Sequence, residues 1–344
     1  KPPDRHRGFI DKKGLSDYLK QRAPHSCFYS TAYYRLPNER KMIDKDWLGA
    51  DLIFDLDGDH LPGVSDNDFP TMISKIQEQA WTLWSEFLEP EFGFKEEHLQ
   101  VTFSGHRGFH LHYRDPALFH LDSEARRELV SHIRGEGVDV KGGLARYHDD
   151  GAQGWTKRIR NGMDDMIHTL SGISNKTGSS SEDLKRLETG LQSLLDREGQ
   201  SSQRTADSIR KLADVVNHHD RVQRLKAGRF ELLGKYQSLF LNLLKSDTSV
   251  VLGSAGETDE VVTIDVRRQI RWPTSLHGKS GMRVSEFPLS RLDPDGSNPY
   301  NPLYEALALG MDESIEVEYT VDDAIAQFGD RRLESKMGDR ISIH

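Results

Sequence analysis

Cysteine is almost absent from this sequence, which has Cys27 alone among its 344 residues. A single cysteine excludes an internal disulfide framework, a zinc site built from several cysteines and an iron–sulfur cluster, and it fits a reducing, cytoplasmic location. Long apolar runs are lacking too. No stretch of about 18 apolar residues occurs, so we expect no membrane span. No internal repeat of fixed period stands out.

Positive charge is in deficit. The chain has 46 Lys and Arg against 55 Asp and Glu, a net charge of −9. This balance excludes a protein with a uniformly basic surface that coats nucleic acid. A nucleic-acid site must therefore be a local basic patch or a metal-bridged one. Hydrophobic residues at 35% and charged residues at 29% are typical of a soluble globular protein. The first residue is Lys1 rather than Met, and we expect the sequence to begin inside a longer chain.

The two ends of the chain have mixed α and β patterns, and the middle is helical. Hydrophobic periodicity predicts helices at 15–19, 69–88, 122–133, 182–196 and 230–244, and strands at 25–29, 51–57, 100–103, 109–113 and 260–266. Asp122 and Ser123 are candidates to cap the third helix. Glycines and charged helical patterns fill residues 135–228. We interpret this stretch as an inserted helical subdomain between two parts of a core, 1–134 and 229–344. Its charged helices fit a solvated decoration and a nucleic-acid contact surface equally well.

The first motif with chemical potential is Leu-Ile-Phe-Asp-Leu-Asp-Gly-Asp at residues 52–59. Alternate side chains of a strand share a face, so Asp55 and Asp57 should point together, away from a core formed by the apolar positions. Two carboxylates so close repel each other unless a divalent cation lies between them, and Mg²⁺ and Mn²⁺ prefer such oxygen ligands. The alternative is a strand end with solvated acids.

The second motif is Ser-Gly-His-Arg-Gly-Phe-His-Leu-His at residues 104–112. Its glycines allow close backbone approach to a ligand, and Ser104 with the turn amides can donate to phosphate oxygens. Arg107 adds a fork of donors. On a strand, His110 and His112 share one face. This arrangement suits a triphosphate, and the alternative is a hairpin with exposed histidines.

The third motif is Arg-Trp-Pro-Thr-Ser-Leu-His-Gly-Lys-Ser-Gly at residues 271–281. Arg271, His277 and Lys279 place three donors on a loop shaped by Pro and Gly, which is a good anion site. Upstream, Asp259 and Asp265 would share the polar face of the predicted strand, so either could be a third metal ligand.

Two families compete for the first motif. Phe-Asp-Leu-Asp-Gly at 54–58 resembles the nucleophile loop of haloacid-dehalogenase-type phosphatases, in which Asp55 would be phosphorylated. That family usually continues with Thr or Val after the Gly, whereas Asp59 and His60 follow here. A phosphatase also leaves both basic motifs unexplained.

Taken together and in this order, the three motifs resemble the small, catalytic subunit of archaeo-eukaryotic DNA primases, archaeal type. The resemblance covers most of 24–112 and 259–281, and includes Phe-Tyr-Ser at 28–30 and Trp-Leu-Gly-Ala-Asp-Leu at 47–52. It implies an α+β fold, the primase catalytic core of mixed β-sheets flanked by helices. The helical subdomain would be inserted in that core.

The resemblance also implies roles for individual residues. Asp55 and Asp57 match the catalytic, metal-binding acids, and Asp259 matches the third better than Asp265 does. The nucleotide-binding positions are Ser104, Arg107, His110, Arg271, His277 and Lys279. The implied activity is a DNA-dependent nucleotidyltransferase that makes short RNA primers, with DNA primers also open, through two Mg²⁺ or Mn²⁺ ions.

The partners implied are a large subunit with an iron–sulfur cluster, single-stranded DNA template, nucleoside triphosphates and other replication proteins, with no membrane. Many members of the family carry a cysteine-rich zinc site. One cysteine cannot build it, so we expect no zinc site. Arg5-His6 is all that matches a longer basic N-terminal motif. A second alternative stays open, a non-catalytic nucleic-acid-binding homologue, although the intact acids argue against it.

Overall fold

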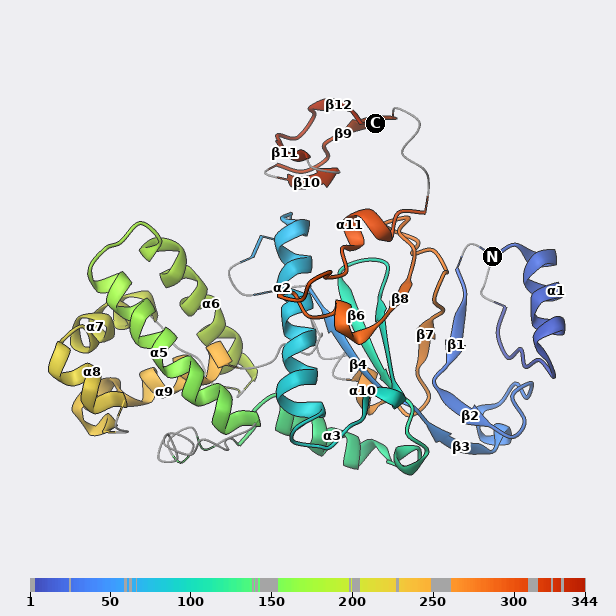
Figure 1. Ribbon diagram of the computed structural model, residues 1–344, viewed down its shortest axis with the longest axis horizontal. Coiled ribbons are helices and arrows are strands. Elements are labelled where there is room, and N and C mark those ends of the chain that lie inside the picture. The colour runs from blue at the N-terminus through green and yellow to red at the C-terminus, as the bar shows by residue number, and fades with distance from the viewer. Residues whose placement is uncertain are drawn as a thin grey trace.

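The computed structural model describes residues 4–24, 26–58, 61, 64–65, 67–137, 139, 142, 154–197, 199, 205–226, 229–248, 261–308, 315–322, 324–328 and 331–343. Figure 1 shows a central sheet with a long helix against it. Helices from residues 154–248 lie on one side of this centre and N-terminal elements lie on the other. The C-terminal strands lie beyond the end of the long helix.

The central sheet has four antiparallel strands in the order β4-β6-β5-β8. They are β4 (Leu52–Asp57), β5 (Leu99–Phe103), β6 (Gly108–Tyr113) and β8 (Ser285–Phe287). The three strands predicted in this part of the chain are confirmed. Apolar side chains from one face of the sheet join the main core, among them Leu52, Phe54, Leu56, Phe109 and Leu111. The opposite face therefore remains for polar side chains.

Helix α2 (Phe69–Leu83) covers the apolar face of the sheet (Figure 1). The Asp68 carboxylate accepts from the backbone N–H of Thr71 at 3.2 Å, and Pro70 stands in the first turn, where a missing N–H costs nothing. Its buried stripe includes Met72, Ile76 and Leu83, as the periodicity predicts. The predicted helix at 69–88 is confirmed, but Trp84–Leu88 is a π-helix, the wider form that occurs mostly as a single turn.

Three N-terminal strands take part in two small sheets beside the polar face. The N-terminal elements are α1 (Lys12–Arg22), β1 (Phe28–Ser30), β2 (Ala32–Tyr34), η1 (Met42–Lys45) and β3 (Trp47–Ala50). Strand β2 pairs with β3, whereas β1 pairs with β7 (Gln269–Arg271), a strand more than 200 residues away. The β1–β7 ribbon thus joins the start of the chain to the third motif. The helix predicted at 15–19 and the strand at 25–29 are confirmed, with shifted ends.

Short elements connect the core: η3 (Glu96–His98), η4 (Pro116–Leu118) and α3 (Ser123–Ile133). Asp122 caps α3, because its carboxylate accepts from the backbone N–H groups of Glu124 and Ala125. The predicted helix and its cap are therefore confirmed.

The middle of the chain is helical: α5 (Gly154–Ser174), α6 (Ser180–Arg197), α7 (Thr205–Val216), α8 (His219–Lys226), η5 (Phe230–Tyr236) and α9 (Gln237–Thr248). Helix α5 packs against α6, α7 and α9, and α6 also packs against α9. The Trp155 ring lies 5.9 Å from the Phe87 ring, and Arg158 contacts Glu86 at 3.0 Å, which joins these helices to the π-helix after α2. The division at 134/135 and 228/229 stays a prediction. Helix α9 begins after the predicted boundary at 228/229, yet it packs against α5 and α6 of the inserted stretch.

The strand predicted at 260–266 is wrong. Residues 251–260 lie outside the described residues, and α10 (Val261–Ile264) is a short helix. Val262 and Ile264 are buried, as expected, but a helix rather than a strand places them there. Further on lie η6 (Leu289–Arg291) and α11 (Pro302–Glu305). Near the C-terminus, the consecutive strands β10 (Ala324–Phe328) and β11 (Arg331–Ser335) pair antiparallel, and the strands on either side of them, β9 (Ile315–Glu318) and β12 (Arg340–Ile343), pair with each other.

The architecture is α+β, as the sequence predicts, with antiparallel sheets and separate helices. Across the described part of the chain, no helix has both the length and the apolar character to cross a bilayer.

Candidate functional site

The two acids of the first motif lie together on the polar face of the central sheet. Asp55 and Asp57 are half-buried on β4, while Leu52, Phe54 and Leu56 are buried on the opposite face. The predicted assignment of the two faces is therefore confirmed. Two carboxylates at i and i+2 on one strand are close enough to repel each other and to share a cation.

Histidine from the neighbouring strand completes this polar face. In the antiparallel register His110 of β6 lies directly opposite Asp55, and its Nε2 is 3.3 Å from Asp55 Oδ1. His110 is only 6% exposed, and its Nδ1 atom is buried with no hydrogen-bond partner among the described residues. Because Nε2 faces a carboxylate oxygen, it carries a proton and donates to Asp55. A buried imidazole nitrogen without a partner is uncommon in folded proteins, and it leaves this nitrogen free to accept a hydrogen bond from a water molecule or a ligand.

The glycine turn of the second motif lies beside the acids. Asp57 pairs with Gly108, and the backbone N–H of Gly58 donates to the carbonyl of Arg107 at 2.9 Å. Ser104 organises the turn, because its Oγ accepts from the backbone N–H groups of His106 and Gly108. Only glycine fits at 108, since a Cβ there would lie 2.2 Å from the carbonyl oxygen of Leu56.

The basic loop of the third motif contacts this turn. Ser280 Oγ donates to the carbonyl of Gly105, and the His277 ring stacks on the His106 ring at 4.6 Å with an interplanar angle of 8°. Gly105 has φ = +83°, and a Cβ there would lie 3.0 Å from His277 Cβ. This contact joins residues 175 positions apart in the chain, so the second and third motifs form one surface, whose glycine turn lies next to Asp57.

The electrostatics of this surface keep His277 neutral near pH 7. Burial, together with Arg271, His106 and Lys279 nearby, lowers the pKa of His277 to about 4. Its Nδ1 accepts from the backbone N–H groups of Lys279 at 3.3 Å and Ser280 at 3.5 Å. The single proton of the neutral ring is then on Nε2, which can donate to an anion. Arg271 Nη1 donates to the carbonyl of Leu276, and its guanidinium lies 4.5 Å from the Phe28 ring centroid.

The candidates for the third acid are Asp259 and Asp265. Asp259 lies outside the described residues. Asp265 follows α10 and its Oδ1 accepts from the backbone N–H of Arg267 at 2.8 Å, which caps the turn that it begins. The shared strand face that would have aligned the two acids does not exist, because α10 is helical. Which acid completes the site stays a prediction.

The residues present fit a hard divalent cation. Carboxylate oxygens are the ligands that Mg²⁺ and Mn²⁺ prefer, and a ligating carboxylate is usually fixed by a second hydrogen bond, as His110 supplies to Asp55. Among the described residues no group of three or more His, Cys, Asp or Glu is arranged to hold a metal ion. Asp55 and Asp57 therefore offer two ligand positions, and a further ligand has to come from elsewhere.

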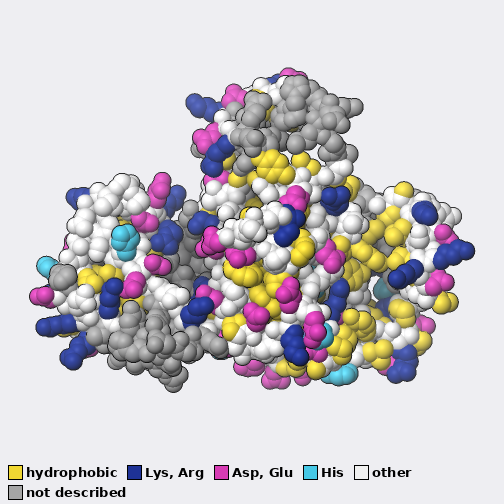
Figure 2. Space-filling view, in the orientation of Figure 1, with side chains coloured by type: hydrophobic (Ala, Val, Ile, Leu, Met, Phe, Trp, Pro, Cys, Tyr) yellow, Lys and Arg dark blue, Asp and Glu magenta, His cyan; other side chains and the backbone are white. Residues whose placement is uncertain are grey.

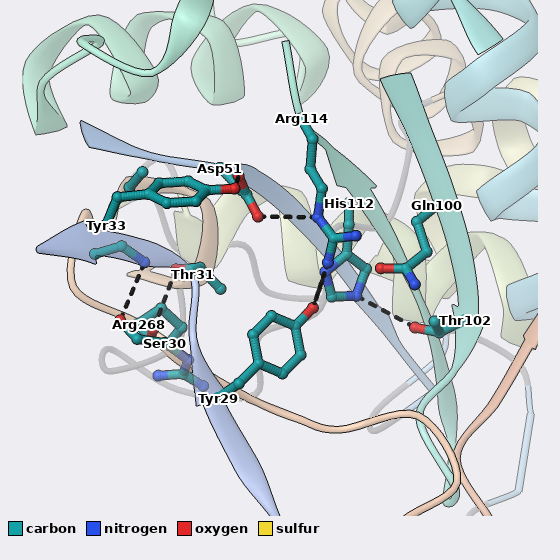
Figure 3. Close-up of polar contacts among 12 residues, drawn as sticks. Tyr29, Ser30, Thr31, Tyr33, Asp51, Gln100, Thr102, His112, Arg114 and Arg268 are labelled. Atoms are coloured by element: carbon teal, nitrogen blue, oxygen red, sulfur yellow. Dashed lines mark hydrogen bonds and ion pairs between the residues drawn. The ribbon is translucent and has the colours of Figure 1, made fainter. Parts of the chain in front are cut away.

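A polar network at the other end of the same face escaped the sequence analysis. Tyr29 of β1, Asp51 at the start of β4, and Arg114 after β6 are linked by hydrogen bonds (Figure 3). Asp51 is 3% exposed, which is rare for an acid without a specific partner. The one sequence signal was its position at the edge of an apolar run. Its partners lie too far along the chain for any pattern to reveal them.

With this geometry in place, comparisons with known proteins define the class. Residues 54–288, which include Asp55, Asp57 and both basic motifs, match the family model of the DNA primase small subunit. The chain therefore belongs to the DNA primase small subunit family.

Particular relatives agree. The DNA primase small subunit PriS of Methanothrix thermoacetophila is 33% identical and the match covers 95% of this chain and 82% of the relative. PriS of Methanococcoides burtonii is 36% identical over 88% of this chain and 75% of the relative. PriS of Methanocella arvoryzae is 32% identical over 90% and 77%. These relatives support a primase enzyme of archaeal type and the replication role predicted from the motifs.

Proposed function

We propose that this chain is the catalytic subunit of a DNA primase that joins nucleotides on a single-stranded DNA template by a two-metal mechanism. One observation carries the proposal: the acidic strand end, the glycine turn and the basic loop form a continuous surface, linked through Asp57–Gly108 and Gly105–Ser280. A nucleoside triphosphate needs such a neighbourhood, with carboxylates for cations at one end and donors for phosphates at the other.

Each group has a role in this proposal. Asp55 and Asp57, with Asp259 or Asp265 as third ligand, would hold Mg²⁺ or Mn²⁺. Such cations, when bound, would supply activation of the attacking 3′-hydroxyl and neutralisation of the pyrophosphate. His110 donates to Asp55 and fixes its orientation.

The basic residues act on the nucleotide. Ser104, through its hydroxyl proton, and Arg107 hold its phosphates from the glycine turn, and Arg271, His277 and Lys279 hold them from the basic loop. The resemblance also assigns His110 to these phosphates, and it would need a second proton, on Nδ1, to donate to them while Nε2 donates to Asp55. Holding the reacting groups in line supplies much of the rate, because bound reactants need no further loss of translational entropy.

Partners and products follow as part of the proposal. The primers are short RNA, with DNA also open, and a large subunit forms a heterodimer with this chain and contacts other replication proteins. A phosphatase with Asp55 as nucleophile is set aside by the family match, and it would leave the basic loop without a use. Localisation in the cytoplasm stays a prediction.

The test is templated incorporation of labelled nucleotides on single-stranded DNA with Mg²⁺ or Mn²⁺. Asp57→Asn removes a charged metal ligand but keeps the side-chain shape, and we expect incorporation to fall by at least about 100-fold. Asp17→Asn, at an exposed position of α1, is the matched control and should retain full activity. Incorporation by Asp57→Asn at the wild-type rate would show that the metal assignment is wrong.

The same assay decides the third acid and the remaining alternative. We expect the larger loss for Asp259→Asn and a smaller one for Asp265→Asn, whose carboxylate already caps a turn. A wild-type chain that binds DNA but incorporates no nucleotide would support the non-catalytic homologue instead.

A further inference from the structure

The candidate site is divided between two separate sheets. The acids are on β4 of the four-stranded sheet, whereas the basic loop leaves β7 of the two-stranded β1–β7 ribbon. For the proposed function, on which this inference rests, phosphates held by the loop must reach cations held by the acids. The ribbon must therefore be fixed on the sheet in one position.

A small apolar cluster provides part of the contact. Ile53 of β4 packs with Val262 and Ile270, and Tyr29 of β1 packs against them. Apolar packing of so few side chains is non-directional, and it permits small sliding movements between the two sheets. Directional contacts are needed to fix the ribbon more closely.

The Tyr29 hydroxyl makes directional contacts of this kind. It lies 3.1 Å from His112 Nδ1 and accepts a hydrogen bond from Arg114 Nη2 at 2.9 Å, both on the β6 side (Figure 3). The Tyr29 ring also meets the Trp272 ring edge-on at 5.7 Å, and Trp272 is the second residue of the basic loop. One side chain therefore touches both the sheet and the base of the loop.

The direction of each hydrogen bond follows from the groups involved. Arginine can only donate, so the single Tyr29 proton goes to His112 Nδ1. Burial lowers the pKa of His112 well below its usual value, so the ring is neutral, and its proton is on Nε2, 3.3 Å from Thr102 Oγ1. Asp51 anchors the other end, accepting from Arg114 at 3.1 Å and from the Tyr33 hydroxyl at 2.8 Å.

The chain of hydrogen bonds ends beside the acids. Thr102 lies opposite His110 in the β5–β6 register, and His110 lies opposite Asp55 in the β4–β6 register. The His112 and His110 rings are 5.8 Å apart. Because the Tyr29 ring contacts Trp272 of the basic loop, a movement of Tyr29 would move the loop relative to Thr102, His110 and Asp55.

We propose that Tyr29 is a positioning residue whose hydroxyl, through His112 and Arg114, holds the basic loop in alignment with Asp55 and Asp57. Tyr29 need not touch the nucleotide for this. Its effect is on the coupling between the two halves of the site, because a misplacement of about 1 Å can remove most of the benefit of alignment.

The test measures this coupling directly, by calorimetric titration of ATP into the full chain with EDTA and with saturating Mn²⁺. The ratio of the two affinities reports how well metal and phosphates are aligned. Tyr29→Phe keeps the ring on Trp272 but removes the hydroxyl. We expect its affinity in EDTA to stay within twofold of wild type and the Mn²⁺ enhancement to fall at least fivefold.

Tyr33→Phe is the matched control, because it removes a tyrosine hydroxyl from the same network without touching His112. Both affinities should stay within twofold of wild type. Melting temperatures establish that the variants are folded, and His112→Gln, expected to show the same loss as Tyr29→Phe, makes the test from the sheet side if Tyr29→Phe does not fold.

Equal behaviour of Tyr29→Phe and Tyr33→Phe would overturn the inference. So would an equal loss of ATP affinity with and without Mn²⁺, which would mean that Tyr29 shapes the loop or contacts the nucleotide itself. A wild-type chain that binds no ATP, or binds it without Mn²⁺ enhancement, would overturn the proposed function and the inference together.

Discussion

Burial keeps the His112 ring neutral over a pH range in which the unfolded chain takes up a proton. The ring is 1% exposed, and burial, with His110 and Arg114 close by, lowers its pKa well below the usual value. The unfolded state therefore binds one more proton than the folded state below pH 6.5 or so, and the folded state loses stability as the pH falls. His277 acts in the same direction between about pH 6.5 and 4, but less strongly because it is more exposed to solvent.

This gives a prediction for one residue. Replacing His112 by Gln should lower the free energy of unfolding at pH 7, because Tyr29 and Thr102 lose a well-placed partner. The wild-type chain should lose free energy of unfolding between pH 7 and pH 5. The substitution should reduce this loss by roughly 1–2 kcal/mol, since one buried histidine accounts for about 1.4 kcal/mol per pH unit. Urea unfolding at the two pH values measures both quantities.

The control is His120→Gln, at an exposed position. For this variant, the free energy of unfolding should change between pH 7 and pH 5 by the same amount as in the wild type. If His112→Gln also left the difference unchanged, His112 would not be a neutral buried group in the folded chain.

Individual residues were predictable where their neighbours follow within a few positions. Alternation along the chain placed Asp55 with Asp57 and His110 with His112, because the period of a strand is fixed by its backbone. The Tyr29 network was not predictable. Tyr29 meets His112 and Arg114 across 83 and 85 residues, and nothing local in the sequence records which distant strands will pair.

Among the elements, α10 shows why a short pattern misleads. Val-Val-Thr-Ile has high strand propensity, and a run of four residues fits a buried helix turn as well as a strand. Tertiary contacts decide here. Thr263 Oγ1 donates to the carbonyl of Ile53 at 2.6 Å, and the buried Arg126 guanidinium donates to the carbonyls of Asp51 and Thr263. Longer elements such as α2 carry several turns of consistent periodicity and were predicted correctly.

The hairpin turn between β5 and β6 supports a prediction for an element. Gly105→Ala introduces a Cβ that meets His277 Cβ at 3.0 Å, at φ = +83°. The turn or the basic loop must move, so we expect the KM for nucleotide to rise about tenfold, as phosphate contacts from the two motifs no longer converge. Backbone strain should lower the free energy of unfolding by about 1–2 kcal/mol.

Gly93→Ala is the matched control, because Gly93 also has a positive φ, +70°, yet a Cβ there meets nothing within 4 Å. It should cost similar stability and leave the nucleotide KM unchanged. Steady-state primer extension and urea unfolding of both variants separate strain from loop displacement. Equal KM values for the two variants would show that the contact between turn and loop does not matter for nucleotide binding.

At the scale of the whole molecule, the sequence predicted the α+β class and a helical middle, but not how the parts meet. Helices α5–α9 join the centre through contacts such as Trp155 on Phe87, and the last of them comes after the boundary predicted at 228. Figure 2 shows hydrophobic side chains on the N-terminal side of this face as well as over its centre. The exposed large hydrophobic residues of the N-terminal segment include Phe28, Tyr33, Leu36, Ile43 and Leu48. Such arrangements depend on long-range packing that no local pattern encodes.

The charge of the whole chain leads to the last prediction. With a net charge of −9, few DNA phosphates can be neutralised outside the basic surface, so the chain's own affinity for template should be weak and fall steeply with salt. Initiation needs template and two nucleotides bound at once, whereas extension starts from a primer already paired to its template. We therefore expect the isolated chain to extend a primed template but to start new primers at least tenfold less efficiently than in the presence of a large subunit.

Synthesis on primed and unprimed single-stranded DNA, with and without that partner and at two salt concentrations, measures both steps, and Asp57→Asn gives the background. Efficient initiation by the isolated chain at physiological salt would contradict this expectation, because it would require template contacts that the overall charge of the chain does not favour.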